Sequence, residues 1–381
     1  MAEQRGRLTW CDSSKAMEGD DRNMEQKKPE AGTLLKQTIE AIRPLNMEAM
    51  ERCQRRWDSI AKPLHSLGRL EEVVIQTAGI TGKDEVHFGK KALIVMCADN
   101  GVVAEGISQT GQEVTAVVAE NFLSGHTSAA IMCKMAGADL FPIDIGIARD
   151  TTLRNEKIAY GTKNMAQEWA MTRTEAVRAV ETGIRIAAEL AEQGYEILAT
   201  GEMGIGNTTT SSAVASVLLD VPAETMTGRG AGLTSEGLKR KQEVIRQAVQ
   251  LHQPDRTDGV DVLAKVGGFD LGGMAGVFLG GAAKKIPVVI DGFISAAAAL
   301  LAVTIRPEAG AYIIASHLSK EPAMQRILEA LGKKPLLTCE MCLGEGTGAV
   351  ALFPLLQMAE AVYSQMSTFG EISIESYKEL K

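Results

Sequence analysis

One carboxylate stands among glycines near the C-terminal end of the 381-residue chain. Glu345 lies in a Leu-Gly-Glu-Gly-Thr-Gly run that begins at Leu343, shortly after an apolar stretch at 335–337. Because glycine has no side chain, a ligand or another segment of backbone can approach this carboxylate closely. Such a carboxylate can act as a general base. On this motif alone the alternative stays open, in which the acid only caps the helix expected at 349–363.

A second glycine-rich segment, residues 201–211, follows an expected strand and leads into an expected helix rich in hydroxyl groups. Backbone N–H groups at a helix start, with the positive end of the helix dipole, form a site for an anion such as phosphate. The spacing matches neither the Walker A motif nor Gly-x-Gly-x-x-Gly, and a threonine-capped helix is the alternative interpretation. A flexible loop begins at Gly228 and leads to Lys239, Arg240 and Lys241, one of which could pair with the same phosphate.

Further polar side chains follow other expected strands. They are Asp99 and Asn100, Asp291, and the pair His317 and Ser319. Because ligands of open α/β sheets bind at the carboxyl ends of the strands, we expect these groups to surround a phosphate-bearing small molecule. For His317 alone, a buried core histidine and a catalytic histidine are both compatible with the sequence.

The elements that must position these groups alternate along the chain. Strands are expected at 92–96, 140–147, 197–199, 287–290, 312–314 and 336–337. Helices lie between them, such as the one entered through the capping box Thr172-x-x-Glu175. This alternation predicts an α/β fold with a mainly parallel, Rossmann-like sheet covered by helices on both faces. The glycine-rich segment 265–276 fits either close helix packing or backbone that lines a pocket.

We expect three parts along the chain. Residues 1–32 carry many charges without apolar periodicity, which predicts a disordered extension. Residues 33–80 show helical periodicity and are expected to form a small helical domain together with part of the C-terminal segment, about 355–381. The α/β domain would then span residues 81–354.

Composition limits the classes of function. A net charge of −8 without a dense block of Lys and Arg argues against a nucleic-acid partner. No apolar run reaches the roughly 18–20 residues of a membrane span, so we expect no membrane partner. Six cysteines are too few for a disulfide scaffold, so we expect buried, reduced thiols, the Cys339-x-x-Cys342 pair included, and a cytoplasmic protein. The histidines lack metal-ligand spacing, and we predict neither a metal nor another cofactor.

Five longer motifs occur in the order and spacing of one family. They are Lys62-Pro63-x-x-Ser66-Leu67-Gly68-Arg69-Leu70-Glu71, Ala98-Asp99-x-Gly101-Val102, Gly201-Glu202-Met203-Gly204, Lys265-Val266-Gly267-Gly268-Phe269-Asp270 and Leu343-Gly344-Glu345-Gly346. On these motifs the chain from about residue 33 to 370 resembles the nicotinate-nucleotide–dimethylbenzimidazole phosphoribosyltransferases. The resemblance implies transfer of phosphoribose from nicotinate mononucleotide to 5,6-dimethylbenzimidazole or a related base, with inversion at the anomeric carbon. The products would be nicotinate and α-ribazole 5′-phosphate, used in assembly of the cobamide (cobalamin) nucleotide loop, and the protein would be a homodimer.

The resemblance also implies roles for individual residues. Glu345 would be the general base, with a pKa raised by its apolar surroundings. Glu202 would be the second active-site carboxylate, placed to support the ribose or the cationic transition state. Positions near the phosphate and the nicotinate match Gly204, Lys241 and Ser319, and positions that line the base pocket match Thr110, Val118, Met203 and Leu343. The predicted substrate-binding set is completed by Gly206, Asn207, Asp270, Asp291 and Gly344.

Three positions depart from the family pattern. Asn100 stands where histidine is common, Leu64 and His65 interrupt a usual Lys-Pro-Pro-Gly-Ser, and Val118 stands where some relatives have glutamine. The apolar Val118 removes a hydrogen bond from the base pocket and leaves the preferred acceptor open. A pyridine-nucleotide glycosyltransferase with another acceptor and a non-catalytic nucleotide-binding relative remain alternatives. The presence of both carboxylates favours a catalyst.

Overall fold

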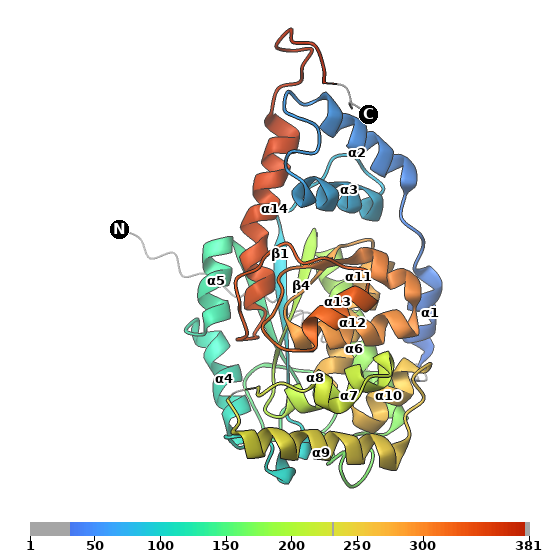
Figure 1. The fold of residues 1–381 in the computed structure, drawn as a ribbon, viewed down its shortest axis with the longest axis vertical. Helices are drawn as coiled ribbons and strands as arrows, with labels where there is room; N and C mark the ends of the chain where they lie inside the picture. The colour runs from blue at the N-terminus through green and yellow to red at the C-terminus, as the bar shows by residue number, and fades with distance from the viewer. Residues whose placement is uncertain (1–30, 231, 378–381) are drawn as a thin grey trace, which may run out of the picture.

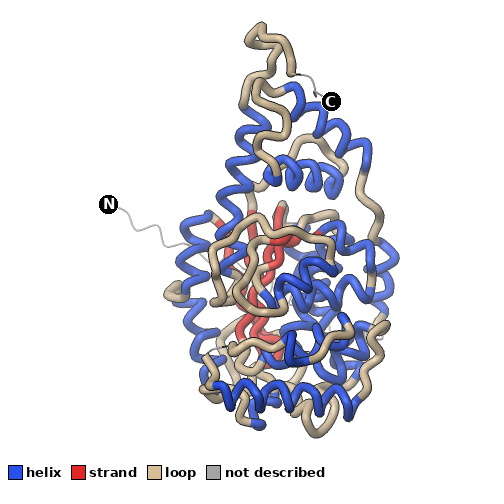
Figure 2. Tube along the Cα trace, viewed as in Figure 1, coloured by secondary structure: helices blue, strands red, loops and turns tan. Residues whose placement is uncertain are grey.

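The computed structural model describes residues 31–230 and 232–377, so the extension predicted over residues 1–32 lies outside the described residues except for its last two positions. A sheet lies in the middle of the molecule with helices on either side, and a group of helices stands at the top of the view (Figure 1). Figure 2 shows the strands gathered at the centre and the helices around them. Within the described ranges, no helix has the length and apolar character needed to cross a bilayer.

The strands form one six-stranded parallel sheet in the order β3-β2-β1-β4-β5-β6. They are β1 (Lys91–Ala98), β2 (Ala138–Gly146), β3 (Arg154–Asn155), β4 (Ile197–Met203), β5 (Val288–Ile290) and β6 (Ile313–Ala315). This is the Rossmann strand order, in which a ligand crevice opens where the order reverses beside β1. The predicted fold class is confirmed. The strand expected at 336–337 is wrong, because Leu337 makes only a single bridge to His317.

Two apolar clusters cover the two faces of the sheet, since side chains alternate along a strand. Ile94 and Met96 of β1 belong to one cluster, and Leu93 and Val95 belong to the other. The first cluster includes α1 (Thr33–Ala41), η1 (Gly101–Glu105), α6 (Arg173–Glu192), α7 (Asn207–Leu219), α8 (Ala223–Met226), α9 (Ser235–His252), α10 (Gly259–Val266), α11 (Phe269–Ala283), α12 (Phe293–Ile305), η2 (Pro307–Tyr312) and α13 (Met324–Ala330). The second includes α2 (Met47–Ser59), α3 (Arg69–Thr81), α4 (Glu113–Ser124), α5 (Ser128–Ala136) and α14 (Thr347–Gln365).

The glycines of α11 let this helix pack backbone to backbone against α6. A Cβ on Gly276 would collide with the carbonyl oxygen of Val180, and a Cβ on Gly183 would collide with the carbonyl oxygen of Gly273. For this part of the segment 265–276, close helix packing is therefore the correct interpretation. The packing fixes the start of α11, where Asp270 lies.

Helices α2 and α3 pack on each other, and both lie against α14 at the top of Figure 1. The rings of Trp57 on α2 and Tyr363 on α14 have centroids 5.0 Å apart. Helix α1 instead packs against α6, where Glu181 accepts hydrogen bonds from the backbone of Gly32 and Leu35 at 3.0 Å each. We propose that the helical domain expected over residues 33–80 and 355–381 is centred on α2, α3 and the end of α14.

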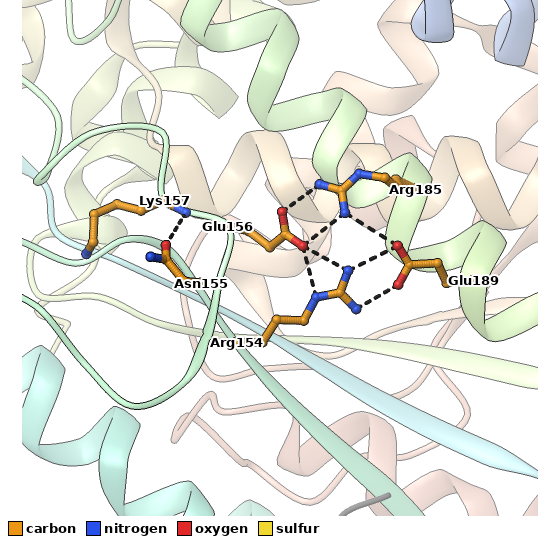
Figure 3. A network of polar contacts seen from close by, with 6 residues as sticks. All are labelled: Arg154, Asn155, Glu156, Lys157, Arg185 and Glu189. Atoms are coloured by element: carbon orange, nitrogen blue, oxygen red, sulfur yellow. Dashed lines mark hydrogen bonds and ion pairs between the residues drawn. The ribbon is translucent and has the colours of Figure 1, made fainter. Parts of the chain in front are cut away.

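A charged network holds the edge strand β3 on α6 (Figure 3). Arg154 donates to Glu189 with 2.7 Å between Nη1 and Oε2. Arg185, on the same helix as Glu189, donates to Glu156 with 2.6 Å between Nη2 and Oε2. Because several charges share fixed partners, such a network stabilises an edge more than an isolated surface pair would. Its role is to anchor the sheet edge opposite β6.

Candidate active site

A cavity of about 360 Å³ opens at the carboxyl ends of β4, β5 and β6. The turn after each strand contributes to its wall, with residues 202–205 after β4, 291–292 after β5 and His317 and Ser319 after β6. Residues 342–345 and Val118 of α4 complete the wall. A smaller cavity of about 80 Å³ shares the turn after β4 and reaches Lys241 on α9. The two cavities lie at the sheet edge where α/β proteins bind ligands.

Glu345 is held in an unusual backbone conformation at this cavity. Its φ is 61°, and its neighbours Gly344 and Gly346 both have a φ of 90°. A residue with a side chain rarely adopts this left-handed region, and such strain occurs often at functional sites. Its Oε2 accepts a hydrogen bond at 3.3 Å from the backbone N–H of Ala129 in the first turn of α5. Burial raises the pKa of Glu345, and the negative charge of Asp291 raises it further, while the hydrogen bond from Ala129 lowers it. The net shift is upward, which confirms the predicted direction.

Asp291 anchors the turn that carries Glu345. Its Oδ1 accepts from the backbone N–H groups of Gly348 at 2.6 Å and Ala349 at 3.2 Å, and its Oδ2 accepts from Gly346 at 3.1 Å. Helix α14 begins at Thr347 without a side-chain cap of its own, so Asp291 satisfies N–H groups that would otherwise lack a partner. Burial raises the pKa of Asp291, while these bonds and His317 oppose the shift. Asp291 was predicted to bind substrate. Both of its carboxylate oxygens instead accept hydrogen bonds from the backbone that follows Glu345.

Glu202 is buried at the end of β4 and accepts a hydrogen bond at Oε2 from the amide Nδ2 of Asn207. The same Nδ2 donates to Asp270 Oδ2 at 3.2 Å. The backbone N–H of Glu345 approaches Glu202 Oε1 at 3.4 Å. Burial, with the negative charge of Asp270, raises the pKa of Glu202 to about 8. Burial raises the pKa of Asp270 to about 6.

Lys241 is a buried cation at the end of the smaller cavity, with 1% of its surface exposed. Its Nζ donates to Thr208 Oγ1 at 2.8 Å and to the carbonyl oxygen of Gly228 at 3.4 Å. Burial lowers the pKa of Lys241 to about 8, and the charge of Glu321 opposes this shift. Helix α7 starts beside it at Asn207, and its N-cap Gly206 offers no side-chain cap. A cation next to an uncapped helix start is suited to an anion such as phosphate.

Most predicted site residues line one of the two cavities. These are Glu345, Glu202, Val118, Met203, Gly204, Gly206, Asn207, Lys241, Asp291, Ser319, Leu343 and Gly344. Thr110 is exposed in the loop before α4, and Asp270 is buried behind Asn207, so neither lines these cavities.

The predicted set of site residues did not include Phe293 and Glu321, which also line the larger cavity. Phe293 begins α12 directly after β5, so the strand-end argument that selected Asp291 could have included it. Glu321 lies in a loop beyond β6, and no motif in the sequence marks it.

The expected burial of the Cys339-x-x-Cys342 pair is wrong, since both thiols are free and exposed. The segment lies in the loop between α13 and α14, which crosses the sheet edge instead of entering the core. Its position is fixed by the backbone: Lys320 donates its N–H to the carbonyl oxygen of Met341 at 3.1 Å. Cys342 therefore lies on the wall of the larger cavity.

Comparison with known proteins bears directly on this site. Residues 42–374 match a family model described as "Phosphoribosyltransferase". Over 348 residues the chain is 49% identical to the nicotinate-nucleotide–dimethylbenzimidazole phosphoribosyltransferase of Ruminiclostridium cellulolyticum, with 91% of this chain and 99% of that protein aligned. It is 48% identical over 351 residues to the protein of the same name from Chloroflexus aggregans, with 91% and 99% aligned.

Solved structures agree with these relatives. The crystal structure of CobT from Thermus thermophilus superposes with a TM-score of 0.82 at 39% identity, covering 87% of this chain and 100% of that one. A match over nearly the full length at this identity establishes a shared fold. The chain belongs to the nicotinate-nucleotide–dimethylbenzimidazole phosphoribosyltransferase family.

Proposed function

We propose that this protein transfers the phosphoribosyl group of nicotinate mononucleotide to 5,6-dimethylbenzimidazole or a related base. The products are nicotinate and α-ribazole 5′-phosphate, which serves assembly of the cobamide nucleotide loop. Relatives at 49% and 50% identity bear the name of this activity. The observation that carries the proposal is Glu345, a carboxylate fixed in a left-handed turn at the mouth of a cavity at the strand ends.

The bond changes account for the small number of reactive groups. The bond from C1′ of the ribose to the pyridinium nitrogen breaks, and its electron pair returns to the nitrogen, so nicotinate leaves as a neutral ring without a general acid. A ring nitrogen of the benzimidazole forms the new bond to C1′. The proton on the other nitrogen passes to Glu345, a step of the kind typically worth about 10²–10⁴-fold. Attack on the face opposite the leaving group converts the β anomer into the α anomer.

We infer that the phosphate binds at the start of α7 beside Lys241. The Gly204–Thr208 turn and Lys241 line the smaller cavity, which shares residues 204, 205, 207 and 208 with the larger one. Phosphate and base then occupy neighbouring cavities with the ribose between them. In this arrangement Val118 and Leu343 border the acceptor base.

We further propose a cytoplasmic homodimer, in keeping with the family resemblance. Light scattering after size-exclusion chromatography tests the assembly, since a mass near that of the 40.7 kDa chain would exclude the dimer. The net charge of −8 supports the absence of a nucleic-acid partner. The acceptor could be 5,6-dimethylbenzimidazole or a related base, because the apolar side chain of Val118 offers no hydrogen bond that would discriminate among bases.

The test is identification of the product. The purified protein is incubated with nicotinate mononucleotide and, in separate reactions, dimethylbenzimidazole, unsubstituted benzimidazole and adenine. Mass spectrometry detects the new nucleotide, and proton NMR assigns its anomeric configuration. We expect an α-configured nucleotide with at least one benzimidazole, whereas release of nicotinate without such a nucleotide, or a β product, would contradict the proposal.

A further inference from the structure

Glu202 and Asp270 are two buried carboxylates that lie side by side, whereas some other buried carboxylates of the described residues are each paired with a lysine. Glu71 pairs with Lys62 at 2.6 Å, and Asp144 pairs with Lys157 at 2.8 Å. Among the described residues, Glu202 and Asp270 form no such ion pair and share a single donor, the Nδ2 of Asn207. Two buried carboxylates that share one amide cannot both be ionised without a large desolvation and repulsion cost.

The surroundings of Glu202 add further negative charge. The charges that act on Glu202 are those of Asp270 on α11 and Asp291 after β5, while the backbone N–H of Glu345 opposes them. Asp99 after β1 acts in turn on Asp270, and His317 after β6 acts on Asp291. The backbone of Gly344 lies so close that a Cβ there would collide with Glu202 Oε1, which leaves little room for water to solvate the carboxyl group on that side. An ionised Glu202 next to Asp270 and Asp291 would be strongly disfavoured.

The two carboxylates differ in how well they hold a negative charge. Asp270 lies in the first turn of α11 and accepts from the backbone N–H of Leu271 at 2.9 Å as well as from Asn207 at 3.2 Å. The positive end of the helix dipole favours an anion at that place. Glu202 accepts from Asn207 and, at a long 3.4 Å, from the N–H of Glu345. A proton shared by this pair therefore resides on Glu202.

We propose that Glu202 meets the nucleotide as a neutral carboxylic acid that donates a hydrogen bond. In this proposal Asp270 is a positioning residue that keeps the proton on Glu202, and Asn207 holds the two carboxyl groups next to each other. The proposal rests on the proposed function, because nicotinate mononucleotide brings a phosphate and a carboxylate into a site that already holds Glu345 as a base. A neutral Glu202 avoids repulsion with that ligand. The different environments of the two glutamates would also give them different roles. Glu345 would accept a proton, and the protonated Glu202 would donate a hydrogen bond.

The first variant is Glu202→Gln, an uncharged analogue of the protonated side chain, with Glu345→Gln as the matched control. We expect Glu202→Gln to lose no more than about tenfold in kcat near neutral pH, while Glu345→Gln loses about 10²-fold or more. In the wild-type protein the rate should fall as pH rises through about 8, the pKa of Glu202. Glu202→Gln should abolish this alkaline fall. Equal losses in both variants near neutral pH would overturn the proposal.

The second variant, Asp270→Asn, tests the positioning role. Removing the negative neighbour lowers the pKa of Glu202, so the alkaline fall should move to lower pH. Replacing Asn207 with alanine removes a bond to the anionic form, so that variant should move the fall to higher pH. A role that is only structural would lower kcat or the melting temperature without opposite shifts of the pH profile, and that outcome would contradict the proposal.

A measurement without turnover separates this proposal from the proposed function. Infrared difference spectra of wild type minus Glu202→Gln near neutral pH should contain the carbonyl band of one protonated carboxyl group, which disappears above the pKa of Glu202. Its absence overturns the shared proton whatever the activity. If the band is present and no nucleotide is formed from nicotinate mononucleotide and any benzimidazole, the proposed function fails while the shared proton stands.

Discussion

Replacing Asp291 with asparagine should loosen the turn that holds Glu345. The carboxylate accepts three backbone N–H groups, from Gly346, Gly348 and Ala349. An asparagine retains the two bonds at Oδ1 and presents its NH₂ to the N–H of Gly346, because the opposite orientation would lose two bonds. One buried N–H is left without an acceptor, which costs about 1–3 kcal/mol.

Loss of the hydrogen bond from Gly346 to residue 291 should also slow catalysis. Gly346 directly follows Glu345, whose φ of 61° persists only while its neighbours hold the turn. We expect kcat to fall by about tenfold or more, since small displacements of a reacting group are costly. The KM for nicotinate mononucleotide should change little, because Lys241 and the start of α7 are untouched.

The assay combines denaturant unfolding with steady-state kinetics, and Asp258→Asn is the control. Asp258 caps α10 by accepting from Val260 at 3.0 Å and Asp261 at 3.1 Å, and asparagine is an equally good N-cap, so little stability should be lost there. If Asp291→Asn costs no more stability than Asp258→Asn, or leaves kcat unchanged, then Asp291 is not the anchor of the Glu345 turn.

Three further results are expected. Lys241→Ala should raise the KM for nicotinate mononucleotide far more than the KM for the acceptor base, because the buried ammonium faces the proposed phosphate site; equal changes, measured by varying each substrate in turn, would indicate a structural role. The pH profile of kcat/KM should rise with pH on its acid side with a midpoint above that of an ordinary glutamate, because burial raises the pKa of Glu345 and only its deprotonated form accepts the proton; a midpoint at or below the ordinary value would remove Glu345 from this role. Benzimidazoles with and without methyl groups should both be used, since each methyl in an apolar pocket is worth only about 1–3 kcal/mol; competition assays that give a preference above roughly 10⁴-fold would point to a polar contact that the Val118 pocket lacks.

The sequence predicted the sheet and the location of the site because both depend on local patterns. Short apolar strands separated by helices predict a parallel sheet, and polar residues directly after the strands must then gather at one edge. Asp291, His317 and Ser319 were selected in this way, and all three line the larger cavity.

The contacts among these side chains could not be predicted in the same way, because they join residues far apart in the chain. Asp291 accepts from the backbone of residues 346–349, and Asn207 joins Glu202 to Asp270, which depends on how α11 packs against α6. The exposure of Cys339 and Cys342 follows from the path of a loop, for which the apolar pattern gives no information. The division into a helical and an α/β domain stays a prediction.

Comparing wild type with Glu345→Gln tests the central claim most directly. Formation of the α-nucleotide from nicotinate mononucleotide and dimethylbenzimidazole is followed by mass spectrometry under single-turnover conditions, with nucleotide binding measured separately by calorimetry. The amide cannot accept the azole proton, so transfer should slow by about 10²–10⁴-fold while the affinity for nicotinate mononucleotide is kept. A loss of less than about tenfold in a folded variant would show that Glu345 is not the base.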